Sequence, residues 1–289
     1  MTPLELVRLP NLMERGSGLP EIKVSLIDGP VNLDHPDLLN ASIVQVPGKP
    51  NPACRITDSV ACTHGTFVAG VLGARRGAQA PAICPGCTLL LRPIFAEVSS
   101  ADDQMPSATA DELAQAISDS VALGARVLNV SAALAQPSHR GERSLEQAIT
   151  YAGQRGALVV AAAGNQGAIG SSVITRHPWV IPVSACDLRG RPMSDSNFGS
   201  SIGRHGLSAP GESVTSLGTN GKPRTSGGTS AAAPFVTGAI ALLWSEFPNA
   251  RPADVKFAVT QSHRRSTIVP PILDAWSAYR WLAAAYQRN

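Results

Sequence analysis

The segment SGGTSAAAPFVTGAIALL, residues 226–243, joins a short polar group to the most apolar run of the chain. That apolar run, residues 231–244, is shorter than the roughly 20 residues that a helix needs to cross a bilayer, and it contains Pro234 and Gly238. We therefore expect a helix buried inside a globular domain, and no membrane partner. Ser230 lies in the first turn of this helix, where a serine commonly acts as the N-cap.

The composition is typical of a globular protein with a substantial core. Of the 289 residues, 44% are hydrophobic and 16% are charged, which argues against a disordered chain. The formal net charge is only +3 and the 24 Lys and Arg residues are scattered, so no nucleic acid is expected as a partner. The first 18 residues lack the basic and apolar regions of a signal peptide, which predicts a cytoplasmic protein, or a secreted one if a leader has been removed.

Five short apolar segments predict the strands of a parallel sheet. None of them alternates apolar with polar residues, as expected for strands that are covered on both faces. They begin at Ile22, Thr88, Ala125, Ala157 and Trp179.

Helical patterns separate these predicted strands. Thr109 and Glu112 have the spacing of a capping box at the start of one helix, and Gly124 marks its end. A second helix is predicted near residues 143–154. Repeated strand, helix and strand imply right-handed crossovers, and so an α/β domain of three layers with a mainly parallel central sheet and helices on both faces.

Four polar residues lie where strands are predicted to end or helices to begin, which is where ligands gather in open α/β sheets. Asp28 ends the first strand, His64 starts an apolar helix, Asn165 follows a later strand, and Ser230 starts the helix described above. Each residue alone is better explained by a turn or a cap. Together they supply a hydroxyl nucleophile, an imidazole base, a carboxylate to orient it, and an amide to stabilise an oxyanion.

The motifs around these residues resemble those of the subtilisin-like serine proteases, the subtilases. Four motifs occur in the chain order of that family: LIDGPVNLDHPDL, THGTFVAGVLGA, AAAGN and SGGTSAAAPFVTGAIALL. The likeness extends from about residue 22 to about residue 281. It implies the three-layer subtilisin-like fold, with a catalytic domain over residues 22–289 after an N-terminal extension of residues 1–21.

The resemblance also implies a role for each polar residue. Ser230 would be the nucleophile, His64 the general base, Asp28 the group that orients the imidazole, and Asn165, with the backbone N–H of Ser230, the oxyanion donor. Because the base must be neutral, activity is expected to fall in acid with an apparent pKa of about 6 to 7. No cofactor is implied. No metal is expected either, because the basic segment at residues 73–87 offers no carboxylate for the calcium ion that the family often binds there.

Subtilases hold their substrate as an extended strand against protein backbone. The matching substrate-binding residues are Ser131, Ala132, Ala133 and Leu134, together with Gly164 and Gln166. Ala133 replaces the usual glycine, and its methyl group predicts a shallow or displaced pocket for the main substrate side chain. Gln166 is neutral, which predicts no preference for a basic side chain.

Within the family, the first motif and the cysteine-flanked segment around His64 most resemble the proteases of cyanobactin maturation. Those cytoplasmic enzymes trim or macrocyclise ribosomally made precursor peptides, so the resemblance implies a peptide or protein substrate such as a precursor peptide. The macrocyclising type carries an inserted helical element. Only 35 residues separate Asp28 from His64, which leaves little room for it, so hydrolysis is expected.

The cysteines do not define the redox compartment. Cys84 and Cys87 form a CPGC sequence without a second ligand pair for zinc, so loop thiols or local disulfides are expected. Cys54 and Cys62 flank a short loop that a bridge would stiffen, and Cys186 is predicted to be a buried strand residue.

Two other functions are weighed against the protease. A catalytically silent scaffold that binds peptides is favoured only by Ala133. A nucleotide-binding protein is disfavoured because Asp28, Gly29 and Pro30, and no Gly-rich phosphate loop, follow the first strand. The oligomeric state does not follow from the sequence.

Overall fold

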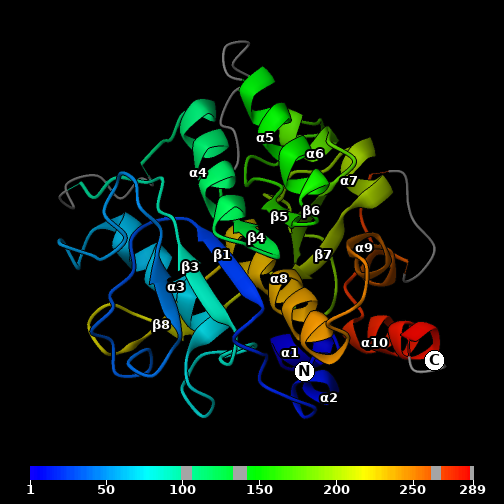
Figure 1. The fold of residues 1–289 in the computed structure, drawn as a ribbon, viewed down its shortest axis with the longest axis horizontal. Coiled ribbons are helices and arrows are strands. Elements are labelled where there is room, and N and C mark those ends of the chain that lie inside the picture. Colours follow the sequence, from blue (N-terminus) through cyan, green and yellow to red (C-terminus); the bar gives the residue numbers. More distant parts are fainter. Residues whose placement is uncertain (99–105, 133–141, 262–267, 287–289) are drawn as a thin grey trace.

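The computed structural model describes residues 1–98, 106–132, 142–261 and 268–286 (Figure 1). Within these residues a seven-stranded parallel sheet forms the centre of the molecule, with the strand order β2-β3-β1-β4-β5-β6-β7. Its strands are β1 (Lys23–Ile27), β2 (Ile43–Gln45), β3 (Thr88–Leu91), β4 (Val127–Val130), β5 (Leu158–Ala162), β6 (Val180–Cys186) and β7 (Leu207–Pro210). A separate antiparallel hairpin consists of β8 (Val214–Leu217) and β9 (Pro223–Ser226).

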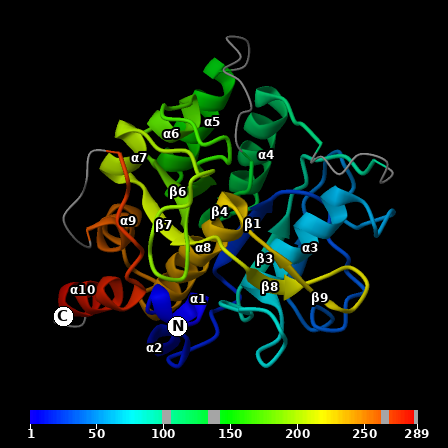
Figure 2. The same ribbon diagram turned by 180° about the vertical axis from the view of Figure 1, so that it is seen from behind.

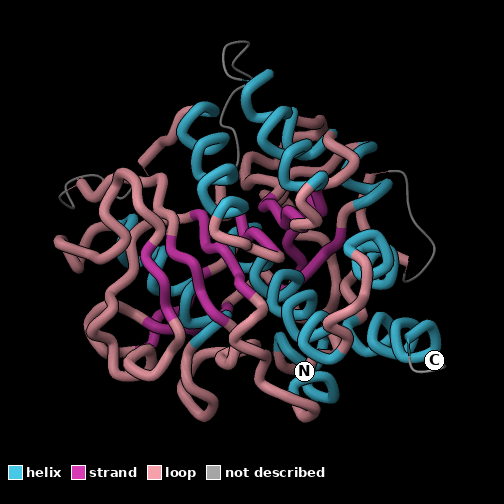
Figure 3. The backbone as a smooth tube through the Cα atoms, in the orientation of Figure 1, coloured by secondary structure: helices cyan, strands magenta, loops and turns pink. Residues whose placement is uncertain are grey.

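Helices cover both faces of the sheet (Figures 1 and 2), and Figure 3 shows the strands in the middle of the molecule. Helices α3 (Val60–Gly73) and α8 (Thr229–Glu246) lie on one face, and α4 (Ala110–Ala122) and α5 (Glu142–Gln154) lie on the other. The other helices are α1 (Pro3–Leu6), α2 (Pro10–Met13), α6 (Val173–Arg176), α7 (Ser200–His205), α9 (Pro252–Thr260) and α10 (Ala275–Tyr286). The predicted three-layer α/β fold is confirmed.

The strand side chains explain why the sheet carries no polar alternation. Successive residues of a strand point to opposite faces. In β1, Val24 and Leu26 pack into the core shared with α3 and α8, whereas Ile27 packs into the core on the other face. Ser25 also faces that second layer, and its hydroxyl donates to Ser120 Oγ of α4 at 2.7 Å. Both faces of β1 are therefore buried.

The ends of two helices bear on the sequence predictions. At α4, the side chain of Thr109 accepts from the backbone N–H of Glu112, whose carboxylate accepts from the backbone N–H of Thr109, so the predicted capping box is confirmed. Helix α3 is capped by Ser59 and begins four residues before His64. The prediction that His64 starts this helix is therefore wrong by about one turn, because Ser59 caps the helix and residues 60–63 form its first turn.

The segment that ends in Leu243 forms the predicted buried helix. Pro234 and Gly238 both lie inside α8, and all the residues from Ala231 to Trp244 are buried. Because this helix is surrounded by other elements, it needs no amphipathic pattern. None of the helices in the described part of the chain combines the length and the apolar character that crossing a bilayer requires.

Residues 1–21 pack onto the rest of the molecule. Val7, Leu9 and Leu12 are fully buried in the core that contains α8 and α10. The backbone N–H of Ala275 donates to the carbonyl of Val7 at 3.0 Å. The first helices and the last helix consequently lie near one another, as Figure 1 shows.

Candidate active site

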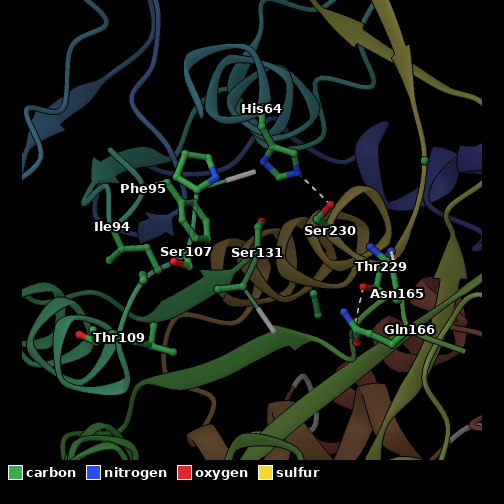
Figure 4. Close-up of a pocket in the computed structure, with 17 residues that line it drawn as sticks. His64, Ile94, Phe95, Ser107, Thr109, Ser131, Asn165, Gln166, Thr229 and Ser230 are labelled. Atoms are coloured by element: carbon green, nitrogen blue, oxygen red, sulfur yellow. Dashed lines mark hydrogen bonds between the residues drawn. The ribbon is translucent and has the colours of Figure 1, made fainter. Parts of the chain in front are cut away.

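Three predicted residues form one hydrogen-bonded chain beyond the carboxyl end of the sheet. Asp28 directly follows β1, His64 lies on the second turn of α3, and Ser230 is the second residue of α8. The distance from His64 Nδ1 to Asp28 Oδ1 is 2.7 Å. The distance from His64 Nε2 to Ser230 Oγ is 2.9 Å, and Figure 4 marks this second contact with a dashed line. With a carboxylate at Nδ1, the imidazole keeps its proton there and presents Nε2 as an acceptor to the hydroxyl of Ser230.

Close backbone packing fixes the distance between Asp28 and His64. A Cβ on Gly65 would lie 2.3 Å from the carbonyl oxygen of Pro30, and a Cβ on Gly29 would lie 2.0 Å from the carbonyl oxygen of Ala61. Only glycine lets α3 approach the turn after β1 this closely. The glycines that follow Asp28 and His64 in the two motifs thus set the position of α3.

The carboxylate of Asp28 is fully buried. Its Oδ1 also accepts from the backbone N–H of Gly29 at 2.6 Å, whereas Oδ2 has no hydrogen-bond partner within the part of the chain that the structure describes. A buried carboxylate in which one oxygen accepts no hydrogen bond favours a positive charge on the neighbouring imidazole. The arrangement therefore stabilises the imidazolium that forms when His64 takes up a proton.

The environment of His64 shifts its pKa upward. Burial by itself lowers the pKa of this imidazole, but the charge of Asp28 and its hydrogen bond to His64 outweigh burial, so the pKa is raised above the ordinary value. The positive charge of Arg224 opposes the increase. His64 thus becomes neutral only at a pH above the ordinary histidine pKa.

Asn165 lies beside Ser230 with its amide held in one orientation. It follows β5, and its Oδ1 accepts from the backbone N–H of Thr229 at 2.9 Å. The backbone N–H of Gly164 in turn donates to Thr229 Oγ1 at 3.1 Å. Since the oxygen is engaged, the Nδ2 group remains to donate into the cleft, next to the N-terminal N–H groups of α8. This pair of donors is suited to stabilise an oxyanion.

A cleft of about 450 Å³ surrounds these groups. Ser131, Ala132, Gly164 and Gln166, four of the predicted substrate-binding residues, line it. The side chain of Gln166 accepts from Asn197 Nδ2 at 2.7 Å, which holds it at the rim. Two further predicted residues, Ala133 and Leu134, lie outside the described residues.

The cleft has an apolar end that the sequence reasoning missed. Ile94 and Phe95, which follow β3, line it together with Leu113 of α4. Figure 4 shows Ile94 and Phe95 on the side of His64 opposite to the yellow strand that leads to Ser230. The signal that could have found them is the position of β3 beside β1, because neighbouring parallel strands deliver their following residues to the same edge.

A buried polar group under the cleft was also missed. Thr237 Oγ1 of α8 donates to Asn129 Oδ1 at 2.9 Å, and Asn129 Nδ2 donates to Ser131 Oγ at 2.9 Å. All three side chains are buried, so each bond satisfies a group that would be costly to leave unpaired. The central helix thereby fixes Ser131, the first residue of the predicted substrate-binding segment.

Among the described residues, one group of potential metal ligands lies close together: Cys54, Cys62 and Glu97. Cys54 and Cys62 form a disulfide, with 5.6 Å between their Cα atoms, so neither can act as a thiolate ligand. The carboxylate of Glu97 accepts from the backbone N–H groups of Arg55 and Ile56. These residues stabilise the loop before α3 and do not fit a metal ion.

The other cysteines are free thiols and are buried: Cys84, Cys87 and Cys186. Burial raises the pKa of the Cys186 thiol to about 12. Of the predicted alternatives, the structure has a local disulfide that joins the loop before α3 to the first turn of α3, thiols in the CPGC sequence, and the expected buried cysteine in β6.

This arrangement of groups on a three-layer α/β fold is that of a serine protease, and comparison with known proteins assigns the family. Residues 20–274 match the model of the Subtilase family. The chain therefore belongs to the subtilase family of serine proteases.

Relatives of known sequence are moderately similar. Subtilisin amylosacchariticus of Bacillus subtilis subsp. amylosacchariticus is 29% identical over 256 residues, which are 86% of this chain and 62% of that protein. Mycosin-3 of Mycobacterium tuberculosis is 30% identical over 277 residues, which cover 75% of this chain and 59% of that protein. The chain thus spans less than two thirds of the length of these curated relatives.

Solved structures are similar over almost the whole chain. A variant of the protease domain of PatA has a TM-score of 0.84 and 31% identity, and the match covers 93% of this chain and 98% of that one. The prenylagaramide maturation protease PagA has a TM-score of 0.83 and 29% identity, with coverage of 96% and 98%. The PatG macrocyclase domain, at 22% identity and a TM-score of 0.81, shares the fold.

Proposed function

We propose that this protein is a serine endopeptidase that hydrolyses peptide bonds through an acyl-enzyme. The observation that carries the proposal is the continuous hydrogen-bond chain from Asp28 through His64 to Ser230, beside the oriented amide of Asn165. A fully buried carboxylate held against an imidazole, which in turn contacts a hydroxyl, is the arrangement that activates a serine.

Each group has one task in the reaction. As Ser230 Oγ attacks the carbonyl carbon of the substrate, its proton moves to His64 Nε2, and Asp28 stabilises the resulting imidazolium. The oxyanion accepts from Asn165 Nδ2 and from the backbone N–H of Ser230. His64 then returns the proton to the leaving amine as the C–N bond breaks. Water, deprotonated by His64, attacks the acyl-enzyme and releases the carboxylate product and the free hydroxyl of Ser230.

The proposed substrate is a ribosomally made precursor peptide, cut by hydrolysis. Sequence identity of 31% to the protease domain of PatA and 29% to the prenylagaramide maturation protease PagA supports this class of substrate. Residues 22–289 are proposed as the catalytic domain and residues 1–21 as its N-terminal extension. The cytoplasmic location stays a prediction, and the Cys54–Cys62 disulfide is more typical of an oxidising compartment.

A peptide library tests the proposed activity. Incubation with the intact protein, followed by mass spectrometry of the products, is expected to give fragments with new carboxyl and amino termini. The Ser230→Ala variant should bind the same peptides and lower the cleavage rate by a factor of about 10⁶. Binding of peptides by the intact protein without any cleavage would contradict the proposal and support the silent scaffold.

A further inference from the structure

The strand that leads into the nucleophile carries a cation on the side of the hairpin that faces α3. Arg224 of β9 pairs directly with Ser216 of β8 in the antiparallel hairpin. Residues paired in this way project to the same face. Ser216 faces α3, because its hydroxyl donates to the backbone carbonyl of Phe67 at 2.7 Å. The side chain of Arg224 therefore leaves the strand on the side that faces α3. Helix α3 carries His64 one turn before Phe67, and Figure 2 shows the hairpin beside this helix.

This hairpin lies on the leaving-group side of the proposed active site. The amine released from the substrate must receive its proton from His64, so the residues after the cleaved bond leave Ser230 on the His64 side. The residues before that bond occupy the cleft lined by Ser131 and Gly164. Ile94 lines the apolar end of that cleft. In Figure 4, Ile94 lies on one side of His64, and the strand that leads to Ser230 lies on the other side.

The charge of Arg224 is uncompensated. The side chain is exposed and forms neither an ion pair nor a hydrogen bond with the residues that the structure describes. Its positive charge nevertheless acts on His64, where it opposes the effect of Asp28 on the imidazole pKa. Geometry and charge thus agree that a cation stands near the point where the leaving group departs.

We propose that Arg224 binds a carboxylate on the part of the substrate that follows the cleaved bond. The enzyme then favours peptides with an acidic residue, or a terminal carboxyl group, at the second position after the cut. An arginine presents a fork of donors that matches a carboxylate. This assignment rests on the proposed protease function.

Paired peptides built around a cleavage site from the library test this selectivity. One pair carries Glu or Gln at the second position after the cut and ends in an amide. The other pair ends at that position with either a free carboxyl group or an amide. We expect the intact protein to show a KM about two- to fivefold lower for the carboxylate member of at least one pair, and the pair that responds identifies the source of the carboxylate. Salt should weaken the difference.

Two variants with the same loss of charge separate Arg224 from a general effect of the hairpin. Arg224→Gln should abolish the difference in KM and move the acid limb of the rate profile to higher pH, because His64 loses an opposing charge. Lys222→Gln is the control. Lys222 is exposed in the turn just before β9 and lines a different depression, with Arg75 and Asp37, so the KM difference and the pH profile should both stay as in the unsubstituted protein.

The results distinguish failure of the assignment from failure of the function. If the unsubstituted protein cleaves all four peptides with equal KM, or if Arg224→Gln keeps the preference for the carboxylate peptides, the role of Arg224 is overturned while the protease function stands. If the unsubstituted protein cleaves no peptide at all, the proposed protease function is contradicted, and the assignment of Arg224 is contradicted with it.

Discussion

The catalytic proposal depends on three side chains that are far apart in the sequence. His64 lies 36 residues after Asp28, and Ser230 lies 166 residues after His64. They meet because β1 delivers Asp28 to the carboxyl edge of the sheet and two helices of the same layer pack against that edge. At this scale the decisive property is the protonation state of His64.

The dependence of activity on pH follows from the raised pKa of His64. The base acts only when neutral, so kcat/KM should fall as the pH drops through this pKa, which lies above the ordinary histidine value of about 6.5. The charged pair with Asp28 stabilises the folded protein below this pKa and ceases to do so as the pH rises through it. Hydrolysis rates measured between pH 5 and pH 9 check the prediction.

The Asp28→Asn variant is the matched test for that pH profile. Without the carboxylate, the pKa of His64 should fall, the acid limb should move to lower pH, and kcat should drop roughly 10⁴-fold. An acid limb that stays in place in this variant would mean that a group other than His64 titrates.

Asn165 is expected to act on the transition state. Its Nδ2 can donate to the oxyanion but is not needed to hold the ground state, so Asn165→Ala should lower kcat by about 10²- to 10³-fold and leave KM nearly unchanged. Steady-state kinetics check this prediction. A large increase in KM, or a loss of folded protein by circular dichroism, would show that Asn165 has a structural role instead.

At the scale of elements, the contact between α3 and the turn after β1 positions the base. Gly65→Ala would place a methyl group 2.3 Å from the carbonyl oxygen of Pro30, so α3 must move away from Asp28. We expect a loss of about 1–3 kcal/mol in the free energy of unfolding and at least a tenfold loss of kcat. Urea unfolding and kinetics measure the two effects.

A second glycine provides the control for Gly65. A Cβ on Gly170 would have no heavy atom within 4 Å, so Gly170→Ala should keep the stability and the rate of the parent. Equal damage from both substitutions would mean that the space around Gly65 is not what positions α3.

The sequence predicted the continuously apolar strands better than the strands that carry polar residues or proline. The five apolar segments became β1, β3, β4, β5 and β6, because burial on both faces leaves a continuous apolar signal. Strands β2, β7, β8 and β9 were not predicted. Strand β2 is largely exposed at the edge of the sheet, β7 contains Ser208 and ends in proline, and β8 and β9 carry serine and threonine, so the apolar pattern is weak there.

For the site, the sequence predicted the groups that we propose take part in the chemistry and missed those that depend on tertiary contacts. Asp28, His64, Asn165 and Ser230 stand in specific motifs. In the sequence, nothing distinguishes Arg224 from the other surface arginines. The register of the hairpin in the structure places it near α3. Packing of this kind depends on which segments meet, and a local pattern does not contain that information.

At the scale of the whole molecule, residues 1–21 contribute Val7, Leu9 and Leu12 to the core. Leu9 is fully buried against elements from the other end of the chain, so Leu9→Ala should cost about 2–5 kcal/mol of the free energy of unfolding. Leu39 is 66% exposed, and Leu39→Ala should change the stability by less than about 0.5 kcal/mol. Thermal and urea unfolding compare the two. Equal stability of both variants would contradict the packing of the N-terminal segment.

The proposed activity requires one activated hydroxyl, that of Ser230, and a fluorophosphonate probe tests for it directly. Peptide mapping of the labelled protein by mass spectrometry should place a single phosphonate adduct on Ser230, with labelling lost in Ser230→Ala and slowed by orders of magnitude in His64→Ala. An intact, folded protein that takes up no probe, or that takes it up equally fast without His64, would contradict the assignment of Asp28, His64 and Ser230 as a catalytic triad.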